Sequence, residues 1–242
     1  MAVPRFYVSD ALEQGATGVL DSNQSRQARS VLRLTTSASL ILFNDSGVEA
    51  DARIVSLANG GVTYEIIAIG RPDREPNLRL TVGLALLKGD RFEVAVQKLT
   101  ELGVARIAPM LTERSVVSFD DARGWQKRSE RYARIAREAA EQSERVTLPV
   151  ITAPVTLAEF LRQQPVIVLL ERAESAPIAT HAPGPEAAIA VGPEGGWSDA
   201  EQALIVREAA GTASLGRLIL RAETAAIVAA GTVIQRAWEA QP

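Results

Sequence analysis

The chain has 242 residues, of which 47% are hydrophobic and 23% charged, and its formal net charge is −3 at pH 7. This length suits one large domain or two smaller ones, and the composition is that of an ordinary globular protein. The absence of cysteine excludes disulfides and thiolate chemistry, and the single histidine, His181, argues against a histidine-based metal site. No apolar run approaches the ~18 residues that cross a bilayer, and the first residues lack the apolar core of a secretion signal. We therefore expect a cytoplasmic protein with neither a membrane segment nor a metal.

Residues 3–70 have the pattern of a small β-rich domain. Runs rich in Val, Ile, Phe and Tyr predict strands at residues 5–8, 39–43, 48–55 and 62–69, separated by turns at residues 44–47 and 59–61. Residues 23–34 predict a short helix with Ala28, Val31 and Leu32 on one face. The segment predicts a β-barrel-like module, followed by a linker at residues 70–76, where glycine and proline interrupt every period.

Strands alternate with helices from residue 78 onward. The predicted strands are residues 78–86, 106–111, 165–170, 187–191, 213–215 and 218–220. The predicted helices are residues 88–102, 124–144, 157–163, 199–209 and 224–240. Ser198 and Glu201 form a capping-box pattern at the start of the fourth of these helices. This alternation predicts an α/β fold with a largely parallel sheet.

Positive charge is concentrated in two parts of the chain. Between residues 121 and 137 there are six cations, which are Arg123, Lys127, Arg128, Arg131, Arg134 and Arg137, against two anions. The N-terminal region adds Arg5, Arg26, Arg29 and Arg33. The acidic total argues against nonspecific coating of nucleic acid, and a single arginine is ordinarily a solvated surface residue. A cluster of this density nevertheless indicates phosphate contacts.

The segment Gly192-Pro-Glu-Gly-Gly196 joins a predicted strand to a predicted helix. Glycines let the backbone approach a ligand closely, and ligands bind outside the carboxyl ends of strands in such sheets. The spacing matches neither the dinucleotide fingerprint nor the P-loop, which disfavours a nicotinamide cofactor and a nucleoside triphosphate. A tight connection without a ligand remains an alternative at this point.

A second segment, residues 215–225, places Gly216 before a predicted strand and Arg221, Glu223 and Thr224 where that strand gives way to a helix. Glu223 and Thr224 are either first-turn residues that suit the helix dipole or groups that face a ligand at the carboxyl end of the strand. Neither segment decides the function alone, but their order along the chain is specific.

Taken together, these segments resemble the RsmE family, the bacterial 16S ribosomal RNA uridine N3-methyltransferases of the SPOUT superfamily. The shared motifs are Arg5-Phe-Tyr, Val31-Leu-Arg33, Lys88-Gly-Asp-Arg-Phe-Glu, Gln97-Lys-Leu-Thr-Glu-Leu-Gly103, Arg137-Glu-Ala-Ala-Glu-Gln-Ser, Gly192-Pro-Glu-Gly-Gly196 and Ile219-Leu-Arg-Ala-Glu-Thr-Ala225. The resemblance implies a PUA-like RNA-binding β-barrel domain at residues 1–72. It also implies a SPOUT-type domain at residues 73–242, with a largely parallel sheet and a C-terminal trefoil knot, and a homodimer whose active sites lie near the subunit interface.

The resemblance further implies that a methyl group passes from S-adenosylmethionine to N3 of a specific uridine in 16S ribosomal RNA, within the small ribosomal subunit. S-adenosylhomocysteine is then the product. The residues implied for cofactor binding are Leu170, Glu171, Gly192, Pro193, Glu194, Gly195, Gly196, Leu215, Gly216, Ile219, Leu220, Ala222, Thr224 and Ala225. Arg221 is expected to stabilise charge on the uridine, and Glu223 is the candidate base.

The residues implied for RNA binding are Arg5, Arg26, Arg29, Arg33, Lys88, Arg128, Arg131 and Arg137. Two other functions remain open from the sequence: a SPOUT methyltransferase that acts on another RNA, and a noncatalytic RNA-binding protein. The missing dinucleotide fingerprint leaves little support for a dehydrogenase. His181 lies beside Pro183 and Gly184 and is interpreted as a loop residue rather than a base.

Overall fold

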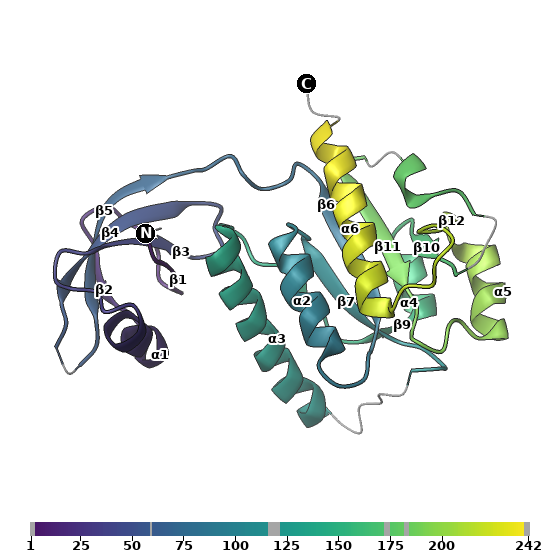
Figure 1. Cartoon of the computed structure of the whole chain (residues 1–242), viewed down its shortest axis with the longest axis horizontal. Coiled ribbons are helices and arrows are strands. Elements are labelled where there is room, and N and C mark those ends of the chain that lie inside the picture. Colours follow the sequence, from purple (N-terminus) through teal and green to yellow (C-terminus); the bar gives the residue numbers. More distant parts are fainter. Residues whose placement is uncertain (1–2, 59, 116–121, 172–174, 182–183, 240–242) are drawn as a thin grey trace. The chain divides into compact units, whose positions relative to one another are not determined.

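In the computed structural model of the chain, residues 3–58, 60–115, 122–171, 175–181 and 184–239 are described. They form two compact units, shown in Figure 1. The first unit comprises residues 1–75 and 140–148, and the second comprises residues 76–139 and 149–242. Each unit has its own buried core.

The first unit is built on a curled five-stranded sheet in the order β1-β3-β4-β5-β2 (Figure 1). Its strands are β1 (Arg5–Tyr7), β2 (Thr17–Val19), β3 (Ser39–Phe43), β4 (Glu49–Ser56) and β5 (Thr63–Gly70). β1 pairs with β3 in parallel and the other pairs are antiparallel. Four strands are at their predicted places, whereas β2 was missed because three residues give no measurable period.

The predicted helix of the first unit has two parts. Helix α1 (Ser22–Arg26) begins at Asp21, whose carboxylate accepts hydrogen bonds from the Asn23 and Gln24 amides, and it continues as a π-helical turn (Gln27–Val31). Ala28 is fully buried in the core of this unit, but Val31 is 71% and Leu32 40% exposed. Of the three residues predicted on one helix face, only Ala28 is therefore buried.

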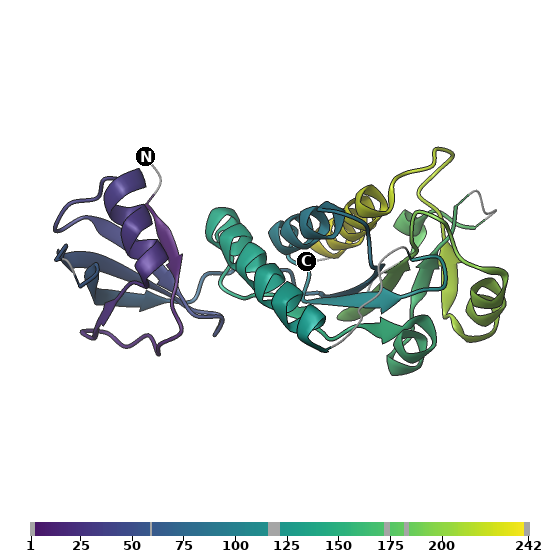
Figure 2. The same ribbon diagram turned by 90° about the horizontal axis from the view of Figure 1, so that it is seen from below.

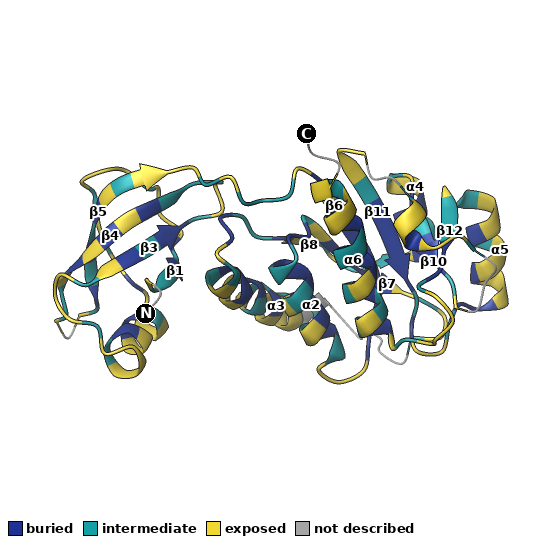
Figure 3. Cartoon of the chain, turned by 45° about the horizontal axis from the view of Figure 1, so that its top comes forward, coloured by how far each residue is buried: buried dark blue, intermediate teal, exposed yellow. Residues whose placement is uncertain are grey.

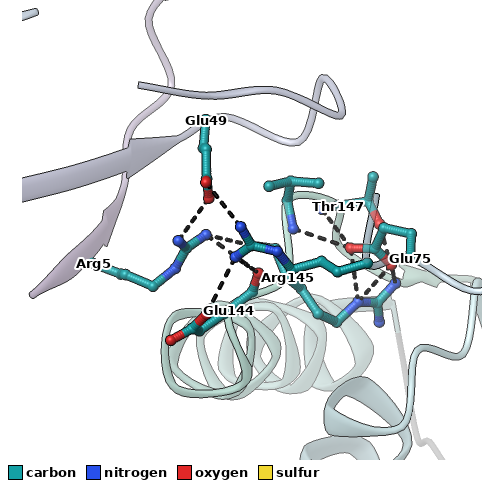
Figure 4. Close-up of polar contacts among 8 residues, drawn as sticks. Arg5, Glu49, Glu75, Glu144, Arg145 and Thr147 are labelled. Carbon is teal, nitrogen blue, oxygen red and sulfur yellow. Dashed lines mark hydrogen bonds and ion pairs between the residues drawn. The ribbon is translucent and has the colours of Figure 1, made fainter. Parts of the chain in front are cut away.

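Residues 140–148 are held in the first unit by charged groups, drawn in Figure 4. Arg5 and Arg74 both bind Glu49, at 2.7 and 2.8 Å. The Arg145 guanidinium lies 2.9 Å from the Glu75 carboxylate, which also accepts hydrogen bonds from the Val146 and Thr147 amides. The side chains of Arg5 and Arg145 are each only 7% exposed. These ion pairs are thus largely removed from solvent, where they are screened less than surface pairs.

The second unit contains a parallel sheet in the order β12-β10-β11-β6-β7-β8, with β9 pairing to β7. The strands are β6 (Arg79–Ala85), β7 (Arg106–Leu111), β8 (Val150–Ile151), β9 (Val155–Thr156), β10 (Ile167–Leu169), β11 (Glu186–Val191) and β12 (Gly211–Ala213). All of these pairs are parallel, which confirms the predicted α/β fold with a parallel sheet. Figure 3 shows β6 and β11 coloured as buried, as expected for central strands covered on both faces.

Helices cover both faces of this sheet, as Figure 2 shows. The helices are α2 (Arg91–Glu101), α3 (Ala122–Ser143), α4 (Leu157–Gln163), α5 (Asp199–Glu208) and α6 (Ala222–Glu239), with a short 3-10 turn at Ile178–Thr180. Residues of α2, α3 and α6 share one buried cluster, whereas residues of α4 and α5 belong to another. The predicted capping box of α5 is present, since the Ser198 hydroxyl accepts from the Glu201 amide.

One predicted strand is absent. Residues 218–220 form no strand, because β12 ends at Ala213 and the chain continues as a loop to the start of α6. Leu218 is 82% and Ile219 51% exposed. A short apolar run was interpreted as a buried strand, but apolarity over three residues does not distinguish a strand from an exposed loop.

Candidate active site

A cavity of about 570 Å³ lies at the carboxyl ends of the parallel strands of the second unit. Its walls come from the segments that follow β10, β11 and β12, together with Arg114 after β7 and Gln202 on α5. Of the fourteen residues predicted to bind a cofactor, thirteen line this cavity, and Thr224 does not. Carboxyl ends of adjacent parallel strands are where such folds place their ligands.

The first wall is the segment from Gly192 to Trp197, which we call the glycine loop. A Cβ on Gly192 would lie 2.9 Å from the Trp197 ring, so a side chain is excluded there. Gly196 has φ = 67°, a left-handed conformation that favours glycine, and its amide donates to the Pro193 carbonyl at 2.9 Å. The Trp197 ring nitrogen donates to the Leu169 carbonyl at 3.1 Å, which ties the loop to the end of β10.

Two arginines from other parts of the chain contact the glycine loop. Arg91, at the start of α2, lies 2.8 Å from Glu194 in an ion pair whose side chains are 38% and 28% exposed. Arg114, on the segment after β7, donates to the carbonyls of Gly195 at 3.1 Å and Trp197 at 3.2 Å. The loop is therefore held by two arginine side chains, from α2 and from the segment after β7, and by the main-chain carbonyl at the end of β10.

The second wall is formed by residues 215–225. Gly216 has φ = 103°, a conformation that L side chains rarely adopt. Leu215, Leu218, Ile219 and Leu220 offer apolar groups to the cavity, and Ala222 and Ala225 add the first turn of α6. Apolar side chains beside exposed glycine backbone form a surface suited to a ligand with both a flat apolar part and polar groups.

The two predicted catalytic residues lie at the edge of this wall. Arg221 is exposed, and neither Arg221 nor Glu223 is among the residues that line the cavity. Glu223, in the first turn of α6, has one carboxylate oxygen, Oε2, that is buried and has no hydrogen-bond partner among the described residues. A buried oxygen without a partner is costly and indicates a functional group or an absent partner.

Arg5, one of the residues predicted to bind RNA, is held within the first unit. Its guanidinium is bound to Glu49 and to the carbonyls of Glu144 and Arg145, and it lies 5.6 Å from the Phe43 ring centroid. These contacts restrain the side chain and stabilise the first unit. Arg26 and Arg33 are exposed, and Arg29, partly buried, donates to the Ser25 and Ala58 carbonyls.

The remaining RNA-binding candidates lie in the second unit. Lys88 is exposed directly after β6. Five cations on α3 are exposed, and we call them the basic stripe: Lys127, Arg128, Arg131, Arg134 and Arg137. Arg131 also lies 2.6 Å from Glu93. The side chain of Arg123, the sixth cation of the cluster, lies outside the described residues.

Six residues that line the cavity were not predicted: Arg114, Leu169, Val191, Trp197, Gln202 and Leu218. Four of them adjoin predicted residues and could have been included by extending each segment by one or two places. Arg114 and Gln202 carry no such signal, since only the pairing of β7 beside β6 and the position of α5 bring them to the cavity.

Within the described residues, no group of three or more His, Asp or Glu side chains is arranged to hold a metal ion. No helix in the described part of the chain is long and apolar enough to span a membrane.

Comparison with known proteins identifies the family. Residues 74–234 match the family model of the RNA methyltransferase domain. The ribosomal RNA small subunit methyltransferase E of Synechocystis sp. is 34% identical over 224 residues, which cover 88% of this chain and 71% of that protein. A Legionella pneumophila protein described as a methyltransferase with bound SAM has a TM-score of 0.90 at 31% identity, covering 96% of this chain and 97% of that one. Ribosomal RNA small subunit methyltransferase E from Neisseria gonorrhoeae, bound to S-adenosyl methionine, has a TM-score of 0.86 at 30% identity and covers 95% of each chain. The chain therefore belongs to the RNA methyltransferase domain family and, within it, to the ribosomal RNA small subunit methyltransferases E.

Proposed function

We propose that the protein transfers a methyl group from S-adenosylmethionine to N3 of a specific uridine in 16S ribosomal RNA of the small subunit. The observation that carries this proposal is the cavity at the carboxyl ends of β10 and β11, walled by the glycine loop and residues 215–225, in a member of this family.

The cavity suits S-adenosylmethionine on three grounds. Its volume of about 570 Å³ lies within the ~300–1,000 Å³ of small-molecule sites. Leu170, Leu215 and Leu220 supply apolar surface for an adenine, and the glycine loop supplies backbone that no side chain shields. Glu171 places a carboxylate beside the space, which suits a ligand that carries a sulfonium and an ammonium.

When bound, S-adenosylmethionine supplies an electrophilic methyl group that needs no covalent intermediate on the protein. The work of the protein is then to align the acceptor with that group, an effect that can contribute ~7–11 kcal/mol. The acceptor N3 is an imide nitrogen, so it must lose its proton before it attacks. We propose that Glu223 takes this proton and that Arg221 stabilises the negative charge on the uracil oxygens.

RNA contacts are proposed for Arg26, Arg29 and Arg33 of the first unit and for Lys88 and the basic stripe of the second. We propose further that the first unit is a PUA-like RNA-binding domain, that the second unit contains a SPOUT trefoil knot, and that the protein is a cytoplasmic homodimer. The target uridine must leave its stack for N3 to be reached.

The test is to map N3-methyluridine in 16S ribosomal RNA from cells lacking this protein, by primer extension and mass spectrometry. We expect the modification to be absent and to return when the gene is supplied. Retention of the modification would refute the assignment, and loss of methylation from transfer RNA instead would assign the enzyme to another substrate.

A further inference from the structure

The glycine loop has few restraints of its own. It contains three glycines, and the described backbone hydrogen bond within it is the one from Gly196 to Pro193. Glycine-rich backbone loses much conformational entropy when it is ordered, and a ligand that orders a loop loses affinity by that amount. A loop that presents backbone to a cofactor therefore benefits from an external restraint that is present before binding.

Arg114 provides such a restraint. Its Nη1 donates to both the Gly195 carbonyl at 3.1 Å and the Trp197 carbonyl at 3.2 Å. The Trp197 carbonyl also accepts from Gln202 Nε2 at 3.1 Å, so it is fixed from two sides. A Cβ added to Gly195 would lie 3.1 Å from Arg114 Cβ, which shows how closely the two segments approach.

Glu201 fixes the backbone next to this arginine. One carboxylate oxygen accepts from the Glu113 amide at 3.0 Å, and the other accepts from the Ser198 amide at 2.9 Å. Glu201 is only 7% exposed, so these hydrogen bonds are shielded from water. A single buried carboxylate thus joins the segment after β7 to the start of α5, directly beyond the glycine loop.

We infer that Arg114 is a positioning residue for the glycine loop and that Glu201 holds Arg114 in place. Together the two residues connect the segments that follow the carboxyl ends of β7 and β11. This inference rests on the proposed function, because it names S-adenosylmethionine as the ligand of the loop. Arg114 is also the only cation among the described residues that line the cavity. No sequence pattern indicated its position there.

The test measures binding of S-adenosylhomocysteine by calorimetry and steady-state methylation of small ribosomal subunits with varied S-adenosylmethionine. For Arg114→Ala we expect binding to weaken about three- to tenfold and KM for S-adenosylmethionine to rise by the same factor. We expect kcat at saturating cofactor and KM for RNA to stay within about twofold of wild type, because the loss falls on ordering the loop. Arg114→Lys should recover part of the affinity, since an ammonium can donate to one of the two carbonyls.

Further variants distinguish the positioning role of Arg114 and Glu201 from a general loss of structure. Glu201→Gln places an amide NH₂ against one backbone N–H donor and should weaken S-adenosylhomocysteine binding. In the double variant with Arg114→Ala, the loss of affinity should be smaller than the sum of the two single losses. Ser198→Ala removes the hydroxyl that caps α5 but leaves the Glu201–Glu113 hydrogen bond, so it should lower Tm without changing affinity. Arg207→Ala, on the exposed side of α5, is the matched arginine control.

Unchanged S-adenosylhomocysteine affinity in Arg114→Ala would overturn the inference. A raised KM for RNA with normal cofactor binding would also overturn it and would place Arg114 against the substrate. Failure of the wild-type protein to bind S-adenosylhomocysteine would refute the proposed function instead, so the two failures are distinguishable.

Discussion

Gly192 and Trp197 meet where the glycine loop leaves β11, and the space between them is too small for a methyl group. A Cβ at Gly192 would lie 2.9 Å from one ring atom of Trp197 and 3.2 Å from two others. The Trp197 ring is itself held by its hydrogen bond to the Leu169 carbonyl, so it cannot move without breaking that bond. The position of the ring therefore sets the shape of the cavity wall.

We predict that Gly192→Ala displaces Trp197 and lowers affinity for S-adenosylhomocysteine about five- to 150-fold, from ~1–3 kcal/mol of overpacking. Calorimetry measures the affinity, and Trp fluorescence reports the ring. Gly184→Ala is the control, because a Cβ there would meet only one atom, at 3.8 Å. Normal affinity in Gly192→Ala would show that the ring moves without cost.

Arg221 and Glu223 have different proposed catalytic roles, and each role is tested separately. If Arg221 stabilises charge that develops on the uracil, Arg221→Ala lowers kcat about 10²–10³-fold with unchanged cofactor affinity. Its exposed side chain makes a structural loss improbable as the cause, and thermal denaturation checks this. Full turnover with normal affinity would eliminate the role.

Glu223→Gln should lower kcat about 10²–10⁴-fold with unchanged cofactor affinity, because it removes the carboxylate proposed to accept the N3 proton. Glu223 Oε2 is buried without a partner among the described residues, so an acceptor is available for a proton. Gln235→Ala, on the exposed face of the same helix, is the matched control. An unchanged kcat would mean that Glu223 has only a structural role in helix α6.

Helix α3 combines a buried face with a row of cations on its exposed face. Lys127, Arg131 and Arg134 are spaced by four and three residues, which places them on one side of the helix. Arg131 shares its charge with Glu93, whereas Lys127 and Arg134 have no described ion pair. The stripe is thus a candidate phosphate-binding surface formed by a single element.

We predict that Lys127→Gln with Arg134→Gln weakens RNA binding at low salt and reduces the slope of log K against log salt by about 1.4–1.8, near 0.7–0.9 for each phosphate contact. Filter binding at several salt concentrations measures both quantities. Arg162→Gln, an exposed cation on α4, serves as the comparison. An unaltered salt slope would mean that the stripe does not touch RNA.

At the scale of the whole molecule, the Glu75–Arg145 pair joins two distant parts of the sequence within the first unit. Burial raises the pKa of the Glu75 carboxyl, but the Arg145 guanidinium and hydrogen bonds from residues 146 and 147 bring its net pKa below the usual 4.5. A carboxyl whose pKa is lower in the folded state stabilises the fold above pH 4.5. That contribution is lost as the pH falls from there through the folded-state pKa.

We predict that Glu75→Gln lowers the free energy of unfolding by about 1–3 kcal/mol at neutral pH and that the difference shrinks below pH 4.5. All three tryptophans lie at residues 125, 197 and 238, in the second unit, so hydrogen exchange of peptides from residues 140–148 is the suitable measurement. Glu65→Gln breaks the more exposed Arg53–Glu65 pair and should cost under ~1 kcal/mol. Equal protection in Glu75→Gln and wild type would contradict the prediction.

Much of the secondary structure was predictable because it depends on the pattern of neighbouring residues in the sequence. The apolar period gave most strands of both units, and the Ser198–Glu201 pair gave the start of α5. Prediction failed for the short apolar run at residues 218–220, which forms a loop, and for the short strands β2, β8 and β9. The contact between Arg5 and Glu49 was also unpredictable, because nothing in the residues next to Arg5 indicates a partner 44 positions away.

The sequence by itself determined that residues 192–196 form a glycine-rich connection between a strand and a helix and that residues 215–225 lead into the last helix, since glycine content and helix caps are local properties. Only the tertiary structure decided that these segments face one another across a cavity and that Arg114 completes its wall. The physical reason is the strand order β12-β10-β11-β6-β7, in which neighbours in the sheet are distant in the chain. Pairing across such distances places the ends of four strands at one edge, and no local period encodes it.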